Sequence, residues 1–179
     1  TDDVLFLFEG DWSELLFINS AYEEVWGGSI AELERGPTLF LEYVHPEDRA
    51  VAERSIERLV SGEQDTVECR INRPDGELRW IHSQGTPIFD EQGNVDRIVG
   101  FVRDITENRE RKAELQKKST LLDQLFTQVP IHMYVKNDDA RHIRVSAHLT
   151  GGPEKYLGRT DLEVFSGGIG EETHADDMR

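Results

Sequence analysis

Three strands are indicated by the stretch Thr66–Thr106 of this 179-residue chain, TVECRINRPDGELRWIHSQGTPIFDEQGNVDRIVGFVRDIT. In its first part, apolar residues such as Val67 and Cys69 alternate with charged ones, which is typical of a half-buried strand. The turn clusters PDG at 74–76 and DEQGN at 90–94 interrupt the pattern. The runs between them, which are expected to form strands, cover 67–72, 78–88 and 95–102. Because short turns join neighbouring antiparallel strands, the stretch predicts an antiparallel meander that ends where the chain becomes helical.

Two further strands and several helices are expected upstream of this stretch. The short apolar runs 4–8 and 15–19 flank a turn and are consistent with a hairpin. Helix-capping residues and the spacing of apolar residues indicate helices over 20–26, 30–33 and 49–60. Pro46 is placed to begin the last of these helices, with Glu47 and Asp48 in its first turn. This order predicts an α+β domain, in which a five-stranded antiparallel sheet has helices on one face.

Several motifs within residues 1–106 resemble those of PAS domains and occur in the order usual for that family. The motifs are NSAYEEVWG at 19–27, VHPEDR at 44–49, PDG at 74–76, RWI at 79–81, PI at 87–88, Asp90 with Gly93, Gly100, and DIT at 104–106. The later motifs correspond to the C-terminal half of such domains, often called PAC. The resemblance implies a PAS fold and a sensory input module of a two-component signal-transduction protein. It also implies an output domain in the same chain, commonly a histidine kinase or a related regulator.

A long helix is expected over 107–129, where the chain lacks Gly and Pro and is rich in helix formers. Asp104 and Glu107 have the spacing of a capping box at its start. Leu115 and Leu122 recur at heptad spacing, and Leu125 occupies the alternate seam position. These leucines predict a helix that pairs with a second copy of the chain or joins two domains. A lone solvated linker helix is the alternative.

The pattern of the first domain begins again after this helix. Strands are expected over 131–136 and 142–145, followed by a short helix over 154–157. The segment GRTD at 158–161 also resembles a stretch found in many PAS domains. We therefore expect residues 130–179 to be the N-terminal part of a second, incomplete PAS domain.

The formal net charge of −16 limits the partners that this chain can have. Such a surface repels the phosphate backbone of a nucleic acid, so we do not expect nucleic-acid binding. The 36 acidic residues, against 15 arginines and only five lysines, resemble the composition of proteins from salt-loving archaea. An ordinary acidic cytosolic protein is the alternative.

The apolar runs and the single cysteine bear on localisation. The longest apolar run, Val4–Phe8, is far shorter than the ~20 residues of a membrane span, so we expect no membrane contact. Cys69 has no second cysteine to pair with, which favours a reducing compartment, the cytoplasm. Because the chain begins at Thr1 and shows no signal peptide, we expect it to be a piece of a longer polypeptide.

No catalytic or metal-binding pattern is found, so we do not expect this piece to be an enzyme. The six histidines lack metal-ligand spacing, and no Ser or Cys lies in a nucleophile motif. Haem-binding PAS domains use a histidine on the helix that corresponds to 49–60 here, and this segment contains no histidine. Photoactive flavin-binding relatives use an Asn-Cys-Arg helix motif, which is also missing. The sequence therefore does not identify a cofactor. Binding of a flavin without a photoactive cysteine remains an alternative.

Strand alternation, the helix expected over 49–60 and the resemblance together predict a set of side chains that face the interior of the domain. The set, which contains Ser83 as its only hydroxyl, is Ile56, Val60, Val67, Cys69, Ile71, Ile81, Ser83, Ile98 and Val102. One interpretation is a filled apolar core without a ligand. The other is a cavity for a small apolar or aromatic ligand.

The opposite face of the sheet is expected to carry Trp80, Val99 and Phe101, which are too apolar to face water. The segment before Val4, the long helix or a second subunit could cover them. In the favoured mechanism, an event in the cavity or at this face changes how Asp104 and Thr106 hold the start of the helix, which passes the change to an output domain. A homodimer is expected. The alternatives are a ligand-free dimerisation module and, more remotely, part of an enzyme whose catalytic residues lie elsewhere.

Overall fold

The computed structural model describes residues 2–128 and 130–165, and the chain divides into two compact units. The N-terminal unit is Thr1–Arg111 and the C-terminal unit is Lys112–Arg179. Val129, the last residue of the predicted long helix, and residues 166–179 of the expected second domain lie outside the described residues.

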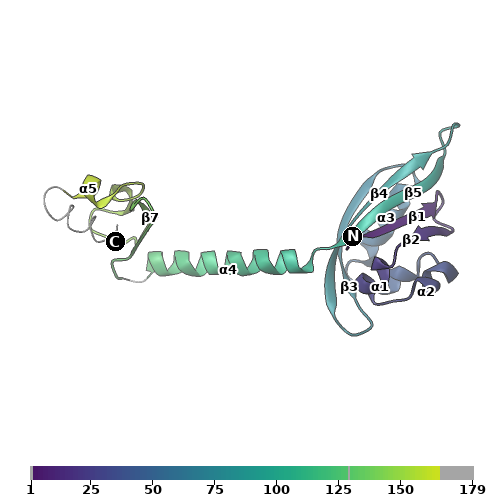
Figure 1. Ribbon diagram of the computed structural model, residues 1–179, viewed down its shortest axis with the longest axis horizontal. Coiled ribbons are helices and arrows are strands. Elements are labelled where there is room, and N and C mark those ends of the chain that lie inside the picture. The colour runs from purple at the N-terminus through teal and green to yellow at the C-terminus, as the bar shows by residue number, and fades with distance from the viewer. Residues whose placement is uncertain (1, 129, 166–179) are drawn as a thin grey trace. The chain divides into compact units, whose positions relative to one another are not determined.

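A five-stranded antiparallel sheet forms the N-terminal unit, in the order β2-β1-β5-β4-β3 (Figure 1). Its strands are β1 (Val4–Glu9), β2 (Leu15–Ile18), β3 (Asp65–Asn72), β4 (Leu78–Phe89) and β5 (Val95–Asp104). The two predicted turns lie where expected, because Gly76 and Gly93 adopt positive φ angles of 87° and 86° there. The predicted sheet and its antiparallel pairing are therefore confirmed.

Short helices cover one face of this sheet (Figure 1). They are α1 (Ala21–Trp26), α2 (Ile30–Arg35), the 3-10 helix η1 (Leu39–Glu42) and α3 (Arg49–Val60). Gly27 ends α1 in the left-handed conformation, and the Ser29 side chain accepts a hydrogen bond from the backbone N–H of Ala31 at the start of α2. The chain thus forms the predicted α+β architecture.

The predicted role of the acidic pair before α3 is wrong. The helix begins at Arg49, so Glu47 and Asp48 lie outside its first turn. Both carboxylates instead bind the guanidinium of Arg70, at 2.8 Å from Glu47 and 2.7 Å from Asp48. An arginine that presents several N–H donors competes effectively with a helix terminus for a carboxylate.

Two glycines at the centre of the sheet allow core side chains to pack directly against the backbone of the strands. Gly85 of β4 and Gly100 of β5 are paired opposite each other. A Cβ atom on Gly100 would lie 2.3 Å from the ring of Phe6, and one on Gly85 would lie 2.7 Å from Leu59. These side chains therefore pack directly on the backbone of the sheet, which no larger residue would allow.

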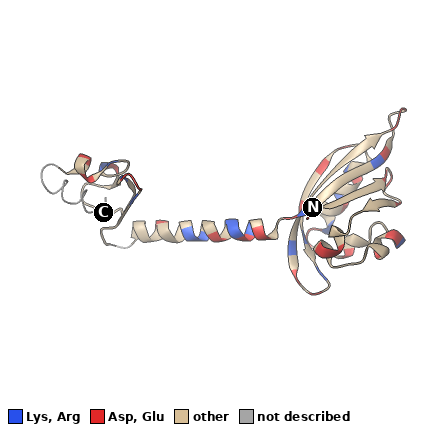
Figure 2. Ribbon diagram, in the orientation of Figure 1, with Lys and Arg blue, Asp and Glu red and all other residues tan. Residues whose placement is uncertain are grey.

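The helix α4 (Thr106–Gln128) follows β5, and the boundary between the two units falls within it. Figure 2 shows its charged residues in the first part and mostly uncharged residues towards its end. Ion pairs one turn apart, such as Lys118–Glu114 at 2.8 Å, support the exposed first part. The predicted interface residues on this helix are exposed: Leu115, Leu122 and Leu125. Their role in an interface stays a prediction.

The C-terminal unit contains a two-stranded antiparallel sheet and two short helical segments. These elements are β6 (Tyr134–Lys136), β7 (His142–Val145), η2 (Pro153–Lys155) and α5 (Asp161–Val164). The first strand begins at Tyr134, three residues later than predicted. A buried ion pair joins Lys136 to Asp161 at 2.6 Å, and His142 lies 3.3 Å from the same carboxylate. A second PAS fold is not evident among the described residues of this unit.

No described helix combines the length and the apolar character that crossing a membrane would require.

Candidate functional site

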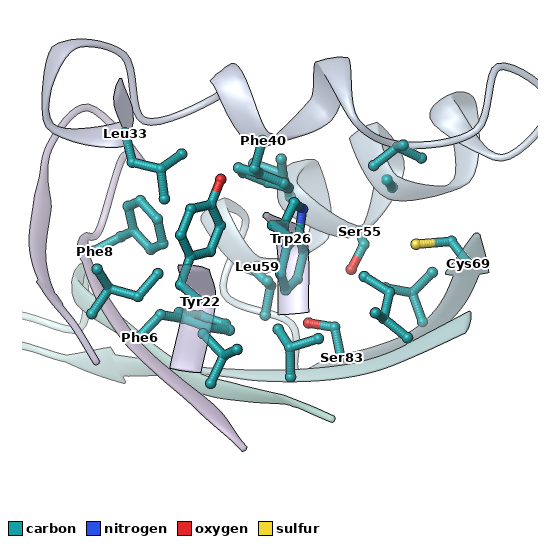
Figure 3. A pocket seen from close by; sticks show the side chains of 18 of the residues that line it. Phe6, Phe8, Tyr22, Trp26, Leu33, Phe40, Ser55, Leu59, Cys69 and Ser83 are labelled. Carbon is teal, nitrogen blue, oxygen red and sulfur yellow. The ribbon is translucent and has the colours of Figure 1, made fainter. Parts of the chain in front are cut away.

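A cavity lies between the helices and the inner face of the sheet in the N-terminal unit (Figure 3). Its volume is about 70 Å³. The helix side is formed by α3, through Ala52, Ser55, Ile56 and Leu59. The sheet side is formed by Val67, Cys69, Ile81, Ser83 and Val102.

The nine residues predicted to face the interior are placed in three groups by the structure. Six line the cavity: Ile56, Val67, Cys69, Ile81, Ser83 and Val102. Ile71 and Ile98 are fully buried in the core but do not line the cavity. Val60 is 36% exposed, so its predicted inward position is wrong. The buried stripe of α3 is Ala52, Ser55 and Leu59, and Val60 lies beside that stripe at the end of the helix.

Aromatic residues from the first 40 positions form much of the remaining wall, and the sequence interpretation missed them. They are Phe6, Phe8, Trp12, Tyr22, Trp26 and Phe40. Two pairs are stacked: Phe8 with Trp12 at 4.2 Å between ring centroids, and Tyr22 with Trp26 at 5.1 Å. The alternation of Val4, Phe6 and Phe8 was the signal that could have placed the first of these rings inside.

Polar atoms in the cavity are more numerous than predicted. Ser83 is not its only hydroxyl, because Ser55 and Tyr22 also line it. Figure 3 shows Ser55 on the helix side of the cavity and Ser83 on the sheet side. Burial raises the pKa of the Cys69 thiol to about 12 and also raises the pKa of the Tyr22 hydroxyl, so both groups are neutral at physiological pH.

Charged and metal-binding groups do not contribute to the cavity. Every residue that lines it is uncharged. Among the described residues, no cluster of three or more His, Cys, Asp or Glu side chains could hold a metal ion. The chemistry available there is therefore packing against rings together with a few neutral hydrogen-bonding groups.

The predicted relay residues connect the start of α4 to β4. Asp104 accepts a hydrogen bond from the backbone N–H of Thr106 at 2.8 Å, and it binds Arg79 at 3.0 Å. The Thr106 hydroxyl accepts from the backbone N–H of Trp80 at 2.9 Å. The Trp80 carbonyl in turn accepts from the N–H of Ile105 at 2.8 Å.

The predicted capping box at this junction is not formed. The helix begins at Thr106, and Asp104 accepts a hydrogen bond from the N–H of Thr106 rather than from that of Glu107. The Glu107 carboxylate instead pairs with Arg111, one turn along the helix, at 3.2 Å. Since Asp104 is shared between a helix cap and an ion pair with β4, it ties the helix to the sheet as well as capping it.

A second set of contacts holds the first turn of α4 from the outer side of the sheet. The guanidinium of Arg109 lies 3.8 Å from the centre of the Trp80 ring and binds the Glu68 carboxylate at 2.6 Å. Arg70 approaches the same ring at 5.6 Å. We call Glu68, Trp80 and Arg109 the outer clamp. The sequence does not indicate this clamp, because nothing in it specifies which strand residues face the helix.

Arg70 also connects the outer clamp to the segment before α3. Asp48 accepts hydrogen bonds from the Arg70 backbone N–H at 2.9 Å and from its guanidinium at 2.7 and 2.8 Å. These bonds lower the pKa of Asp48 from 3.8 to about 2. The start of α3, β3 and the Trp80 ring are thus joined by one arginine.

The outer face of the sheet remains apolar next to the clamp. Val99 is 40% exposed, and Phe101 lies opposite Leu5, which is 43% exposed. Phe17 of β2 is 53% exposed. Of the predicted coverings, the start of α4 contacts Trp80, whereas nothing among the described residues covers Val99.

The domain that these observations define is an α+β sensor fold, with an aromatic cavity under its helices and an outgoing helix tied to its sheet. The family model described as the PAS fold matches residues 15–102. A solved domain of a protein from Haloarcula marismortui, described as a light and redox sensing histidine kinase, is 46% identical. That match covers 58% of this chain and 90% of that one, with a TM-score of 0.54. The chain belongs to the PAS family.

Curated relatives are similar over the same part of the chain. The bacterioopsin transcriptional activator of Halobacterium salinarum is 33% identical over 116 residues, which is 64% of this chain and 17% of that protein. An uncharacterized sensor-like histidine kinase of Rhizobium meliloti is 33% identical over 84 residues, which is 45% of this chain and 16% of that protein. The chain thus spans about a sixth of the length of these relatives.

Proposed function

We propose that the N-terminal unit senses a small molecule in its cavity and passes the signal through β4 to α4. The observation that supports this most directly is the position of Trp80 beside Ile81 on β4. Ile81 lines the cavity on the inner face, whereas Trp80 binds Thr106 and Arg109 on the outer side. Two residues further on, Ser83 also lines the cavity. A ligand that moves this strand therefore also moves the groups that hold the start of the helix.

The relay depends on the free-energy difference between two states of the first turn of α4. In one state, Asp104, Thr106 and the outer clamp hold the first turn of α4 on the sheet. In the other, these contacts are loosened, and α4 is free to change its relation to whatever follows it. The ligand favours the state in which its own contacts with the cavity are better, and that preference sets the size of the signal.

The parent protein is a cytoplasmic signalling protein of a haloarchaeon, in this proposal. Similarity to the Haloarcula and Halobacterium proteins and the charge of −16 support that host. A histidine kinase or a transcriptional regulator is the output that the relatives suggest.

The C-terminal unit is, in the same proposal, the beginning of a second PAS domain, because the order β6, β7, η2, α5 repeats the order β1, β2, α1, α2.

Hydrogen exchange tests the relay in the purified chain. Ser83→Leu introduces apolar bulk into the cavity and imitates occupancy, and Ser13→Leu makes the same change at an exposed turn position. We expect the amides of 106–113 to change their exchange rate at least threefold in the Ser83 variant and to remain unchanged in the Ser13 variant. Equal exchange in both variants would show that the cavity and the helix are not connected.

A ligand-free dimerisation module is the second candidate, and the exposed apolar outer face favours it. A second copy that covers Val99, Leu5 and Phe17 would remove this surface from water. Val99→Asp is then expected to convert dimers to monomers in light-scattering measurements, and Val51→Asp, at an exposed position on α3, is the control. Native mass spectrometry separates the two functions, since a retained small molecule contradicts a module that binds nothing.

A further inference from the structure

Two tryptophans that line the cavity have indole N–H groups without an acceptor among the described residues. The indole N–H groups of Trp12 and Trp26 are buried without a hydrogen-bond partner among the described residues, and their side chains are only 8% and 3% exposed. Both residues line the cavity. An indole N–H can donate a hydrogen bond but cannot accept one. Since buried donors are normally satisfied, these two groups require an acceptor that the described protein does not supply.

Trp12 occupies this place against the preference of its backbone. Its φ angle is 63°, in the left-handed region that bulky residues rarely adopt. The ring is held by stacking on Phe8 and by contact with Phe6 and Phe40. Packing around the cavity therefore imposes the position of this donor.

The rest of the lining limits the charge and shape of the missing acceptor. No charged side chain lines the cavity, so a carboxylate, phosphate or ammonium group would lose its hydration without a counter-charge. Most of the lining is aromatic or aliphatic, with the hydroxyls of Tyr22, Ser55 and Ser83 as the other oxygen groups. Stacked ring pairs along one wall favour a flat, conjugated molecule.

The volume of the cavity limits the size of the ligand. It is about 70 Å³, roughly half of the ~150 Å³ that accommodates benzene. The ligand is therefore no larger than one small ring that carries an acceptor.

We infer that the cavity binds a neutral, flat, largely apolar molecule that carries a hydrogen-bond acceptor, such as a conjugated ketone or a nitrogen heteroaromatic, for the indole N–H groups of Trp12 and Trp26. This inference rests on the proposed sensing function, since it names the class of ligand for the same cavity. Ordered water is the competing acceptor, because it too can accept from an indole N–H.

A matched pair of small probes, 2-cyclopentenone and cyclopentene, tests the acceptor. The two have nearly the same ring, but only the ketone can accept a hydrogen bond. The ketone is better hydrated in water, so without a hydrogen bond in the cavity it should bind more weakly. We expect calorimetric titration of the chain to show at least tenfold tighter binding of the ketone. Equal binding, tighter binding of cyclopentene, or no binding of either probe overturns the inference.

Variants and indole signals locate the contact. Trp12→Phe and Trp26→Phe should remove the advantage of the ketone and leave the affinity for cyclopentene nearly unchanged, whereas Trp80→Phe should keep that advantage. The chain has only three tryptophans, so their indole N–H resonances can be followed individually without any substitution. The ketone should shift those of Trp12 and Trp26 and not that of Trp80; an advantage that survives both cavity variants, or no such shift, overturns the inference. If cyclopentene binds as tightly as the ketone and alters exchange in α4, the sensing function stands while the ligand class fails.

Discussion

Replacing Arg109 by alanine should release the start of α4 without unfolding the domain. The arginine lies 3.8 Å from the centre of the Trp80 ring and 2.6 Å from the Glu68 carboxylate. The Arg109 side chain itself is 43% exposed, so its loss leaves no cavity in the core. Thr106 and Asp104 still hold the backbone of the junction in this variant. The change therefore isolates the outer clamp from the core of the fold.

The size of the effect follows from the two contacts of Arg109. A cation–π contact at a partly exposed site contributes about 0.5–1 kcal/mol. An exposed ion pair such as Arg109–Glu68 contributes about 0.2–1 kcal/mol. Together they stabilise the docked first turn by about 0.7–2 kcal/mol, which corresponds to an opening equilibrium that changes about 3- to 30-fold. Arg111, which pairs only with Glu107 along the helix, contributes about 0.3–0.5 kcal/mol.

Amide hydrogen exchange measures this opening directly. In Arg109→Ala, protection of 106–113 should fall by about 3- to 30-fold, while β5 keeps its protection. Arg111→Ala, two residues along the same helix, should lower protection about twofold at most. Molar salt should weaken the ion-pair part of the effect and leave most of the ring contact. If the two variants lose the same protection, Arg109 acts only as a helix residue and the outer clamp does not hold α4.

Three further outcomes test the fold and its chemistry. Gly100→Ala should lower the free energy of unfolding in urea by about 2–3 kcal/mol, because its Cβ would meet the Phe6 ring. Asp48→Asn should lower the free energy of unfolding by about 2 kcal/mol, because it removes the charge that binds Arg70. The native pKa of Asp48 is about 2, whereas its ordinary value is 3.8. Its contribution to stability is therefore complete above about pH 4 and is lost as the pH falls towards 2. Acid titrations of stability should show this dependence in the parent chain and not in the Asp48→Asn variant. Iodoacetamide should label Cys69 at pH 8 at least about 100-fold more slowly in the folded chain than in urea, because burial raises its thiol pKa to about 12.

The sheet could be predicted because its information is local. Val67, Cys69 and Ile71 alternate with charged residues, and Gly76 and Gly93 stand where turns need a positive φ. Each signal lies within a few residues of the element that it specifies. The same is true of α3, whose predicted bounds match the structure.

The cavity could be predicted only in part, because side chains from distant segments complete it. Val60 follows the apolar spacing of α3, yet the crossing of helix and sheet leaves it outside the buried stripe. The aromatic wall that includes Trp12 depends on how the first hairpin and α1 pack over the sheet. Nothing local to Arg109 or Trp80 indicates that they meet. Such contacts depend on tertiary register, which periodicity within one element does not contain.

The strength of the junction bears on whether it can transmit a signal. A contact that is much stronger than the differential binding of a ligand would hold α4 in one state whether or not the cavity is filled. The outer clamp contributes about 0.7–2 kcal/mol, and couplings between two sites in proteins are typically about 1–3 kcal/mol. A ligand that displaces Ile81 or Ser83 by its own contacts can therefore shift the equilibrium at Trp80 and Arg109. The buried core around Ile71 and Ile98 is too costly to rearrange at this scale, so the exposed clamp is the part of the domain that can respond.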